Sequence, residues 1–213
     1  MRTHLWPPNK SFDRGTVNAG AFTTQVNFAV TCTKNMRRNS TEILELYIKG
    51  KDQDEYLILE EIYTEDAEVE FEIASNSISF PESILGNKDI ARVLSKEFNQ
   101  NYQEVKTYYL SRPANKLSNI YEQNWLVVMR DIKSGKTRVG TGHYNWEFLN
   151  DSKNLKIQRH KIYIHEMLNI EDEQMSELTR IQDELNYPWV DKKKVCSVLN
   201  ANIAFENITK YLK

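Results

Sequence analysis

Residues 121–149, YEQNWLVVMRDIKSGKTRVGTGHYNWEFL, constrain the fold of this chain more than any other segment. Two strand-forming stretches flank the polar, glycine-containing turn at residues 131–136, which is the pattern of a β-hairpin. Because side chains alternate between the two faces of a strand, Tyr144, Trp146 and Phe148 share one face of the second strand. Such an aromatic face needs a covering layer, so the sequence predicts a sheet with at least one face packed against other elements.

The composition fits one domain with appendages: 213 residues, 40% hydrophobic and 27% charged, with a net charge of −2. The near-neutral charge argues against a nucleic-acid partner. The basic runs at 37–38 and 192–194 are short, which is typical of a solvated surface. Cys32 and Cys196 lie too far apart to predict a disulfide framework or a zinc site. Residues 17–32 are too polar for a signal peptide or a membrane span. We therefore expect a cytoplasmic chain without a membrane partner, metal or cofactor.

The periodicity of apolar residues divides the chain into three parts. Residues 1–40 form an irregular extension with one expected strand at 25–33, and residues 168–213 form a helical extension. The central part, residues 41–167, is expected to contain two helices, a strand at 67–73, a helix at 87–102, and strands at 105–112, 124–130, 137–148 and 155–166. Four consecutive strands favour an antiparallel meander, and the fold class is α+β. In the tail, one helix carries Met175 to Leu185 and a last one runs from 191 to 212.

The order helix, helix, strand, helix and four strands resembles the nuclear transport factor two-like superfamily, which includes SnoaL-like cyclases and ketosteroid isomerases. The resemblance is carried by the segments Leu46–Tyr47 through Tyr63–Phe71, Ile84–Ile90, and Trp125–Val127 with Arg138–Trp146. It covers residues 41–167. Within the superfamily the chain is similar to a poorly characterised bacterial group that has Tyr-Asp-Trp where this sequence has Tyr144-Asn145-Trp146. The Tyr187-Pro188-Trp189 segment is similar to the tail of that group.

The resemblance implies a curved antiparallel sheet wrapped around the N-terminal helices, forming a cone with a pocket, and a homodimer that pairs through the outer sheet face. It also implies roles for three positions of the isomerase site, which is a worked example of pKa tuning. The tyrosine that binds the oxyanion corresponds to Tyr47. The carboxylate base corresponds to Phe71, so it is missing, and the protonated aspartate falls near Tyr144. A ketosteroid-type proton shuttle is therefore not expected.

Two sets of side chains are candidates for function. His143 and His160, with Tyr47, are the catalytic candidates, because histidine exchanges protons near neutral pH. Strand alternation places His143 on the face opposite Tyr144, and His160 on a face with Ile162. Aromatic side chains with a polar group suit a small flat ligand. The expected ligand-binding residues are Tyr47, Phe71, Trp125, Tyr144, Trp146 and Tyr163.

Three functions remain open from the sequence. The first is a pocket protein that binds a small apolar or aromatic molecule without converting it, which the missing base at Phe71 favours. The second is an isomerase, cyclase or dehydratase that acts on a small cyclic ketone or alcohol by acid–base catalysis. The third is a structural dimerisation domain whose cone is plugged by side chains.

Overall fold

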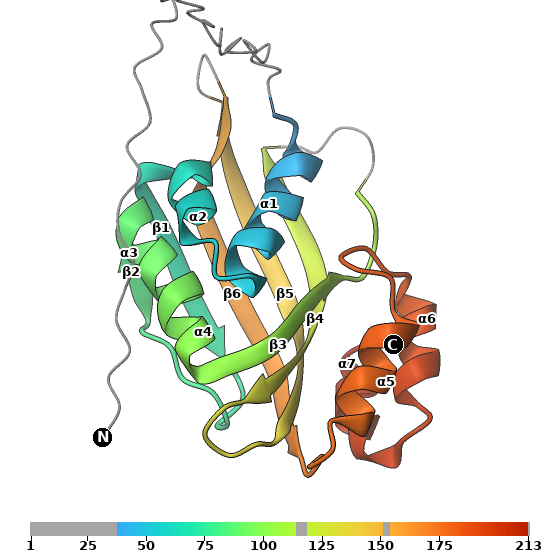
Figure 1. Cartoon of the computed structure of the whole chain (residues 1–213). Helices are drawn as coiled ribbons and strands as arrows, with labels where there is room; N and C mark the ends of the chain where they lie inside the picture. Colours follow the sequence, from blue (N-terminus) through green and yellow to red (C-terminus); the bar gives the residue numbers. More distant parts are fainter. Residues whose placement is uncertain (1–37, 114–118, 151–153, 213) are drawn as a thin grey trace, which may run out of the picture. The chain divides into compact units, whose positions relative to one another are not determined.

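The computed structural model describes residues 38–113, 119–150 and 154–212. The strand expected at residues 25–33 and the rest of the extension up to residue 37 lie outside this range. The described residues belong to one compact unit. It consists of a curved mixed sheet with one layer of helices on each face (Figure 1).

The first layer contains helices α1 (Ser40–Asp52) and α2 (Tyr56–Ile62), followed by α3 (Asn87–Ala91), the π-helical segment η1 (Arg92–Glu97) and α4 (Phe98–Asn101). The last three run on without a break, which confirms the single helix expected at 87–102. Helix α1 begins at Ser40, and its N-cap is Asn39. Asn39 and Glu42 form a capping box in which each side chain accepts a hydrogen bond from the other residue's backbone N–H.

The sheet has six strands in the order β2-β1-β6-β5-β4-β3. They are β1 (Tyr63–Ile73), β2 (Ser83–Leu85), β3 (Tyr102–Tyr109), β4 (Ile120–Asp131), β5 (Thr137–Asn150) and β6 (Leu155–Ile170). Strands β3 to β6 form the expected antiparallel meander. The sheet as a whole is mixed, because β1 pairs in parallel with β6.

The hairpin of β4 and β5 is confirmed. The Asp131 N–H donates to the Lys136 carbonyl at 2.9 Å, and the Gly135 N–H donates to the Asp131 carbonyl at 2.9 Å. The Asp131 carboxylate accepts from both the backbone and the hydroxyl of Ser134. Gly135 has a φ of +67°, a conformation that glycine adopts without strain. The turn residues therefore fix the register that puts the aromatic face of β5 on the inner side of the sheet.

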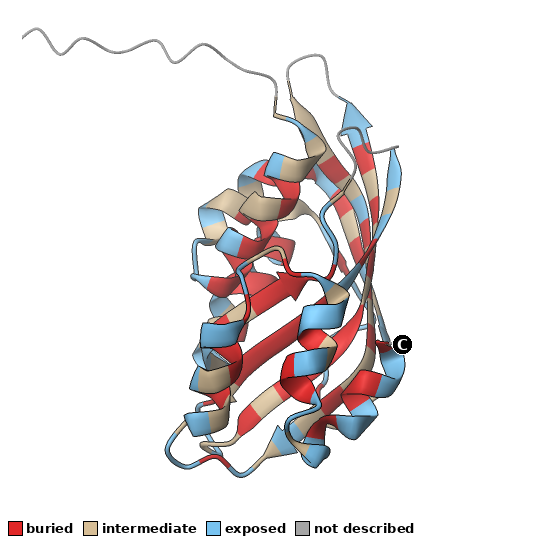
Figure 2. Ribbon diagram, turned by 90° about the vertical axis from the view of Figure 1, so that its right-hand side faces the viewer, coloured by how far each residue is buried: buried red, intermediate tan, exposed pale blue. Residues whose placement is uncertain are grey.

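The inner face of the sheet and the first helical layer enclose the main hydrophobic core. Tyr144, Trp146 and Phe148 of β5 are all buried there. Figure 2 shows that buried positions gather where the helices face the sheet, while exposed positions lie on the outer sides of the helices. The covering layer that the aromatic face requires is thus supplied by α1 to α4.

The C-terminal segment covers part of the outer face with α5 (Ser176–Glu184), α6 (Lys192–Leu199), the 3-10 turn η2 (Ile203–Phe205) and α7 (Glu206–Tyr211). The single helix expected at 191–212 is wrong. The chain breaks at residues 200–202, where the Asn202 side chain accepts a hydrogen bond from the Ala204 N–H and starts a new turn. A second hydrophobic core lies between these helices and the sheet. The buried residues that the strands contribute are Tyr108, Leu126, Val128 and Val139, and Leu110 directly follows β3.

The segment between α5 and α6 runs along the edge strand β3. The Tyr109 N–H donates to the Pro188 carbonyl at 2.7 Å, and the Val190 N–H donates to the Tyr109 carbonyl at 2.9 Å. The Trp189 indole N–H then donates to the Glu45 carboxylate on α1 at 2.6 Å. The C-terminal segment therefore connects both helical layers across the sheet edge.

An apolar part of the outer face is buried within the chain, under α5 to α7. The expected homodimer, which would pair through this face, stays a prediction. No helix among the described residues has the length and apolar character needed to cross a membrane.

Candidate ligand cavity

A small cavity of about 40 Å³ lies between the inner face of the sheet and the first helical layer. Helices α1, η1 and α4, strands β1 and β3 to β6, and the loop between β1 and β2 contribute to its walls. The lining residues are Tyr47, Lys51, Phe71, Ile78, Phe80, Leu94, Phe98, Thr107, Trp125, Val127, Met129, Tyr144, Ile162, Ile164 and Met167. At roughly 10–15 Å³ per molecule, this volume suits about three waters.

Aromatic rings form much of the cavity wall. The rings of Phe71 and Phe80 stack with centroids 4.6 Å apart, and those of Trp125 and Tyr144 stack at 5.4 Å. The loop between β1 and β2, which carries Phe80, is anchored by Arg138. The Arg138 guanidinium donates to the Ser77 carbonyl at 2.7 Å and pairs with the Asp131 carboxylate at 2.9 Å. These flat apolar surfaces are the kind that bury a small aromatic molecule.

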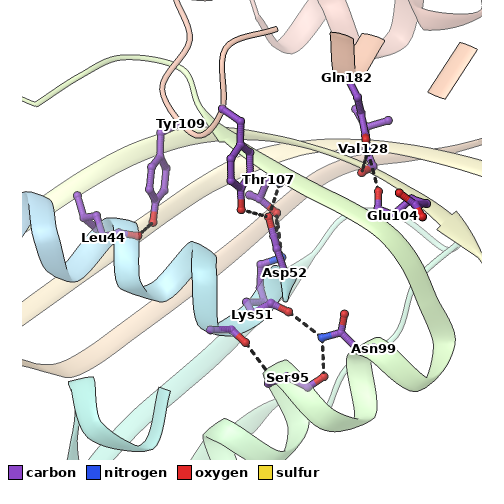
Figure 3. Close-up of polar contacts among 12 residues, drawn as sticks. Leu44, Lys51, Asp52, Ser95, Asn99, Glu104, Thr107, Tyr109, Val128 and Gln182 are labelled. Atoms are coloured by element: carbon purple, nitrogen blue, oxygen red, sulfur yellow. Dashed lines mark hydrogen bonds and ion pairs between the residues drawn. The ribbon is translucent and has the colours of Figure 1, made fainter. Parts of the chain in front are cut away.

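A buried ion pair stands at the C-terminal end of α1 (Figure 3). Lys51, which lines the cavity, places its ammonium 2.5 Å from the Asp52 carboxylate and donates to the Thr107 hydroxyl at 2.8 Å. The Lys51 ammonium also lies 4.8 Å from the centre of the Phe98 ring. The side chains of Lys51 and Asp52 are only 8% and 1% exposed.

Both oxygens of the Asp52 carboxylate accept hydrogen bonds. The carboxylate accepts from the Thr107 backbone N–H at 2.6 Å, from the Thr107 hydroxyl at 3.0 Å, and from the Tyr187 hydroxyl at 3.1 Å. Asp52 thus joins α1, β3 and the C-terminal segment. No local sequence pattern indicates this network, because its members are brought together only by the tertiary fold.

Among the residues that line the cavity, the buried indole N–H of Trp125 has no acceptor among the described residues, and the buried hydroxyl of Tyr47 interacts with Tyr144. Burial, together with the neighbouring tyrosines, raises the pKa of Tyr47 well above its usual value. Burial likewise raises the pKa of Tyr144. Both hydroxyls therefore stay protonated at neutral pH.

His160 lies behind the cavity wall. Its Nδ1 is 2.7 Å from the Tyr63 hydroxyl, and its ring stacks on Trp146 at 3.6 Å. Tyr47 and Tyr144, which do line the cavity, pack against it at 5.1 and 4.9 Å. Its Nε2 has no hydrogen-bond partner among the described residues. Full burial lowers the pKa of His160 well below 6.5, so the ring is neutral at pH 7.

His143 lies on the outer face, as strand alternation predicts. Its Nδ1 is 2.7 Å from the Nε2 of His165, and its ring stacks on Tyr163 at 4.0 Å. A polar cleft of about 300 Å³ opens beside the two histidines and α7. Burial lowers the pKa of His143, while the Glu122 charge raises it. The sheet therefore separates His143 and Tyr163 from the cavity.

The expected site residues fall into three groups. Tyr47, Phe71, Trp125 and Tyr144 meet around the cavity. Trp146 and His160 form a buried layer behind them. The placement of Tyr163 with Tyr144 and Trp146 is wrong, because Tyr163 extends from the opposite face of β6, where its partners are His143 and Lys161. Within the described ranges, no three His, Cys, Asp or Glu side chains come together in a set that could hold a metal ion.

The buried His160 makes stability depend on pH. In the unfolded chain this histidine takes up a proton near pH 6.5, whereas in the folded chain it does so only at a much lower pH. The unfolded state therefore binds more protons below pH 6.5, and the free energy of unfolding falls there by up to about 1.4 kcal/mol per pH unit. Urea unfolding at pH 7.5, 6.5 and 5.5 measures this. His160→Gln should flatten the dependence more than His143→Gln, and an unchanged slope in His160→Gln would contradict the assignment.

The cone-shaped arrangement of helices and curved sheet is the nuclear transport factor two-like fold. The solved structure of LinA aligns with a TM-score of 0.50 and 13% identity, covering 60% of this chain and 86% of LinA. A type 2 hexachlorocyclohexane dehydrochlorinase (LinA) aligns with a TM-score of 0.48 and 15% identity, covering 61% and 86%. A nuclear transport factor 2-like superfamily protein from Salmonella enterica serovar Typhimurium aligns with a TM-score of 0.47 and 13% identity, covering 64% and 92%.

At these identities the likeness shows the fold alone. Neither a protein-family model nor a curated protein matches this chain in sequence. The fold resemblance inferred from the sequence is confirmed, and the function has to be argued from the cavity.

Proposed function

We propose that this protein binds a small apolar or aromatic molecule in the cavity between α1 and the sheet. The observation that supports this most is the wall itself. Apolar and aromatic side chains make up nearly all of it, while Tyr47, Trp125 and Thr107 add a few polar groups. A cavity that combines apolar walls with a few orienting polar groups has the composition of a ligand site.

The cavity must enlarge to admit an aromatic ring, because about 40 Å³ is well below the roughly 150 Å³ of a cavity that holds benzene. Met129 and Met167 line it, and methionine side chains change rotamer at low cost. The ligand is therefore expected to displace these side chains as it enters.

Native mass spectrometry of the freshly purified protein, before any ligand is added, tests the proposal. The expected result is a species heavier than the chain by the mass of one small molecule, which is released on denaturation. Ile164→Trp, which fills the cavity from β6, should lose the added mass. Leu168→Trp, on the outer face of the same strand, is the matched control and should keep it.

A structural domain with a plugged cone is the second candidate, and the small volume of the cavity favours it. Under this alternative the aromatic side chains only fill the core. Wild type and Ile164→Trp would then both give the bare chain mass, and neither would take up an added apolar probe.

Acid–base catalysis has less support from the geometry. None of the three described histidines lines the cavity, and the position that corresponds to the base is Phe71. The catalytic roles of Tyr47, His143 and His160 remain predictions. Turnover of a discovered substrate that is lost in His160→Gln would restore this alternative.

A further inference from the structure

We propose that His143 and His165 together bind a divalent transition-metal ion, such as Zn²⁺, on the outer face of the sheet. The site lies across the sheet from the ligand cavity, so it is independent of the proposed function. Three observations carry it: the contact between the two imidazole rings, the strand irregularity that produces this contact, and the polar cleft that both rings line.

The two imidazole rings meet through their nitrogen atoms. The Nδ1 of His143 lies 2.7 Å from the Nε2 of His165. Two imidazoles that share one metal ion at about 2.0–2.1 Å have their nitrogens roughly 2.9–3.4 Å apart, so a small separation and rotation of the rings admits an ion. Each neutral ring carries one N–H, and the donor of the present contact only has to move its proton to its other nitrogen. Both contacting nitrogens then offer a lone pair to the metal.

A β-bulge in β6 produces this contact. The consecutive β5 residues Thr141 and Gly142 pair with β6 residues two positions apart, which leaves His165 as the extra residue of the bulge. A Cβ on Gly142 would lie 1.8 Å from the carbonyl oxygen of Tyr163, so only glycine permits so close an approach of the two strands. Bulges re-aim side chains and are frequent next to functional sites. Here the bulge turns His165 toward His143.

Neighbouring aromatic rings hold both imidazoles in place. The His143 ring stacks on Tyr163 with centroids 4.0 Å apart, and the His165 ring packs on Tyr211 of α7 at 5.3 Å. Side chains that are already fixed lose little rotamer freedom when they bind an ion. Burial also lowers the pKa of His143, so this ring is neutral at pH 7, as a metal ligand has to be.

The polar cleft of about 300 Å³ gives water and a metal ion access to the pair. Glu122 and Lys192 also line this cleft, so their opposite charges balance and the imidazole nitrogens decide which ion binds. Imidazole suits Zn²⁺, Cu²⁺ and Ni²⁺, whereas Mg²⁺ and Ca²⁺ prefer oxygen ligands. The pair supplies two protein ligands, in keeping with the absence of a three-residue metal set within the described ranges. Water therefore completes the coordination from the cleft, as in an open metal site.

Calorimetric titration of the full chain with ZnCl₂ at pH 7.5 tests the proposal, and MgCl₂ is the comparison. We expect one Zn²⁺ ion to bind per chain and Mg²⁺ not to bind. His143→Gln and His165→Gln should each weaken Zn²⁺ binding at least tenfold. His160→Gln is the matched control and should keep the wild-type affinity, because His160 is 1% exposed and belongs to the layer behind the inner cavity.

NMR of the wild-type chain gives a second readout. Zn²⁺ should shift the imidazole signals of His143 and His165 in a saturable way and leave those of His160 unchanged. Three results would overturn the proposal: no Zn²⁺ binding to the wild-type chain, Zn²⁺ binding that survives in both His143→Gln and His165→Gln, or Mg²⁺ binding as tight as that of Zn²⁺. The two histidines would then form only a hydrogen bond between strands.

Discussion

Replacing Asp52 by alanine is expected to lower the free energy of unfolding by about 3–5 kcal/mol. The change removes the carboxylate that pairs with Lys51 among the described residues, and it leaves a buried ammonium without compensation. It also removes the acceptor of the Thr107 backbone N–H and of the Tyr187 hydroxyl. Chemical denaturation at pH 7 measures the loss.

Two comparisons isolate the buried pair. Glu55→Ala breaks the ion pair between Glu55 and Lys49, and both of these side chains are nearly half exposed. This change should alter the free energy of unfolding by less than about 1 kcal/mol. Adding Lys51→Met to Asp52→Ala should restore part of the lost stability, because the uncompensated charge is then gone. A loss below 1 kcal/mol in Asp52→Ala would contradict a tightly buried network.

Deleting residues 171–213 is expected to have the second largest effect, namely loss of a folded, monodisperse protein. The deletion uncovers the apolar side chains that the sheet contributes to the outer core, including Tyr108 and Leu126. It also takes away the segment that pairs with β3 and the Tyr187 hydroxyl that binds Asp52. An exposed apolar patch on a sheet promotes association between chains.

Size-exclusion chromatography with light scattering and thermal unfolding would measure this effect. Within the full chain, Ile181→Ala should cost about 2–5 kcal/mol, because Ile181 is fully buried between α5 and the sheet. Ile203→Ala is the control, since this side chain is 82% exposed, and it should be close to neutral. A truncated chain that stays folded with an unchanged melting temperature would show that α5 to α7 are not part of the core.

The hairpin and the meander could be predicted from the sequence because their signals are local. The turn at Asp131–Lys136 and the alternation along β5 fix which residues face inward, and the burial of Tyr144 and Trp146 confirms it. The same alternation separates His143 from Tyr144 on β5, and the structure has His143 on the outer face. Tyr163 follows that rule too: it lies between Ile162 and Ile164, which line the cavity, and extends from the opposite face of β6.

The contacts that define the candidate site have no such local signal. Tyr63 and His160 are 97 positions apart, and they meet because β1 pairs in parallel with β6, a pairing that the meander does not imply. The sequence pattern predicts that residues 50–52 interrupt the first helix, whereas α1 continues to Asp52. Only the approach of β3 and of the C-terminal segment turns Lys51 and Asp52 into a buried network. The break of the last helix at Asn202 depends on a side-chain cap and was missed for the same reason.

The measurement that tests the central claim most directly is a titration of the methionine-methyl-labelled full chain with acetophenone, followed by NMR. Met129 and Met167 line the cavity, whereas Met175 packs against the outer core and serves as the reference within the same sample. Binding in the cavity predicts saturable shifts of the Met129 and Met167 methyl signals and an unchanged Met175 signal. Unchanged Met129 and Met167 signals up to the solubility limit of the probe would contradict the proposal that this cone is a ligand-binding site.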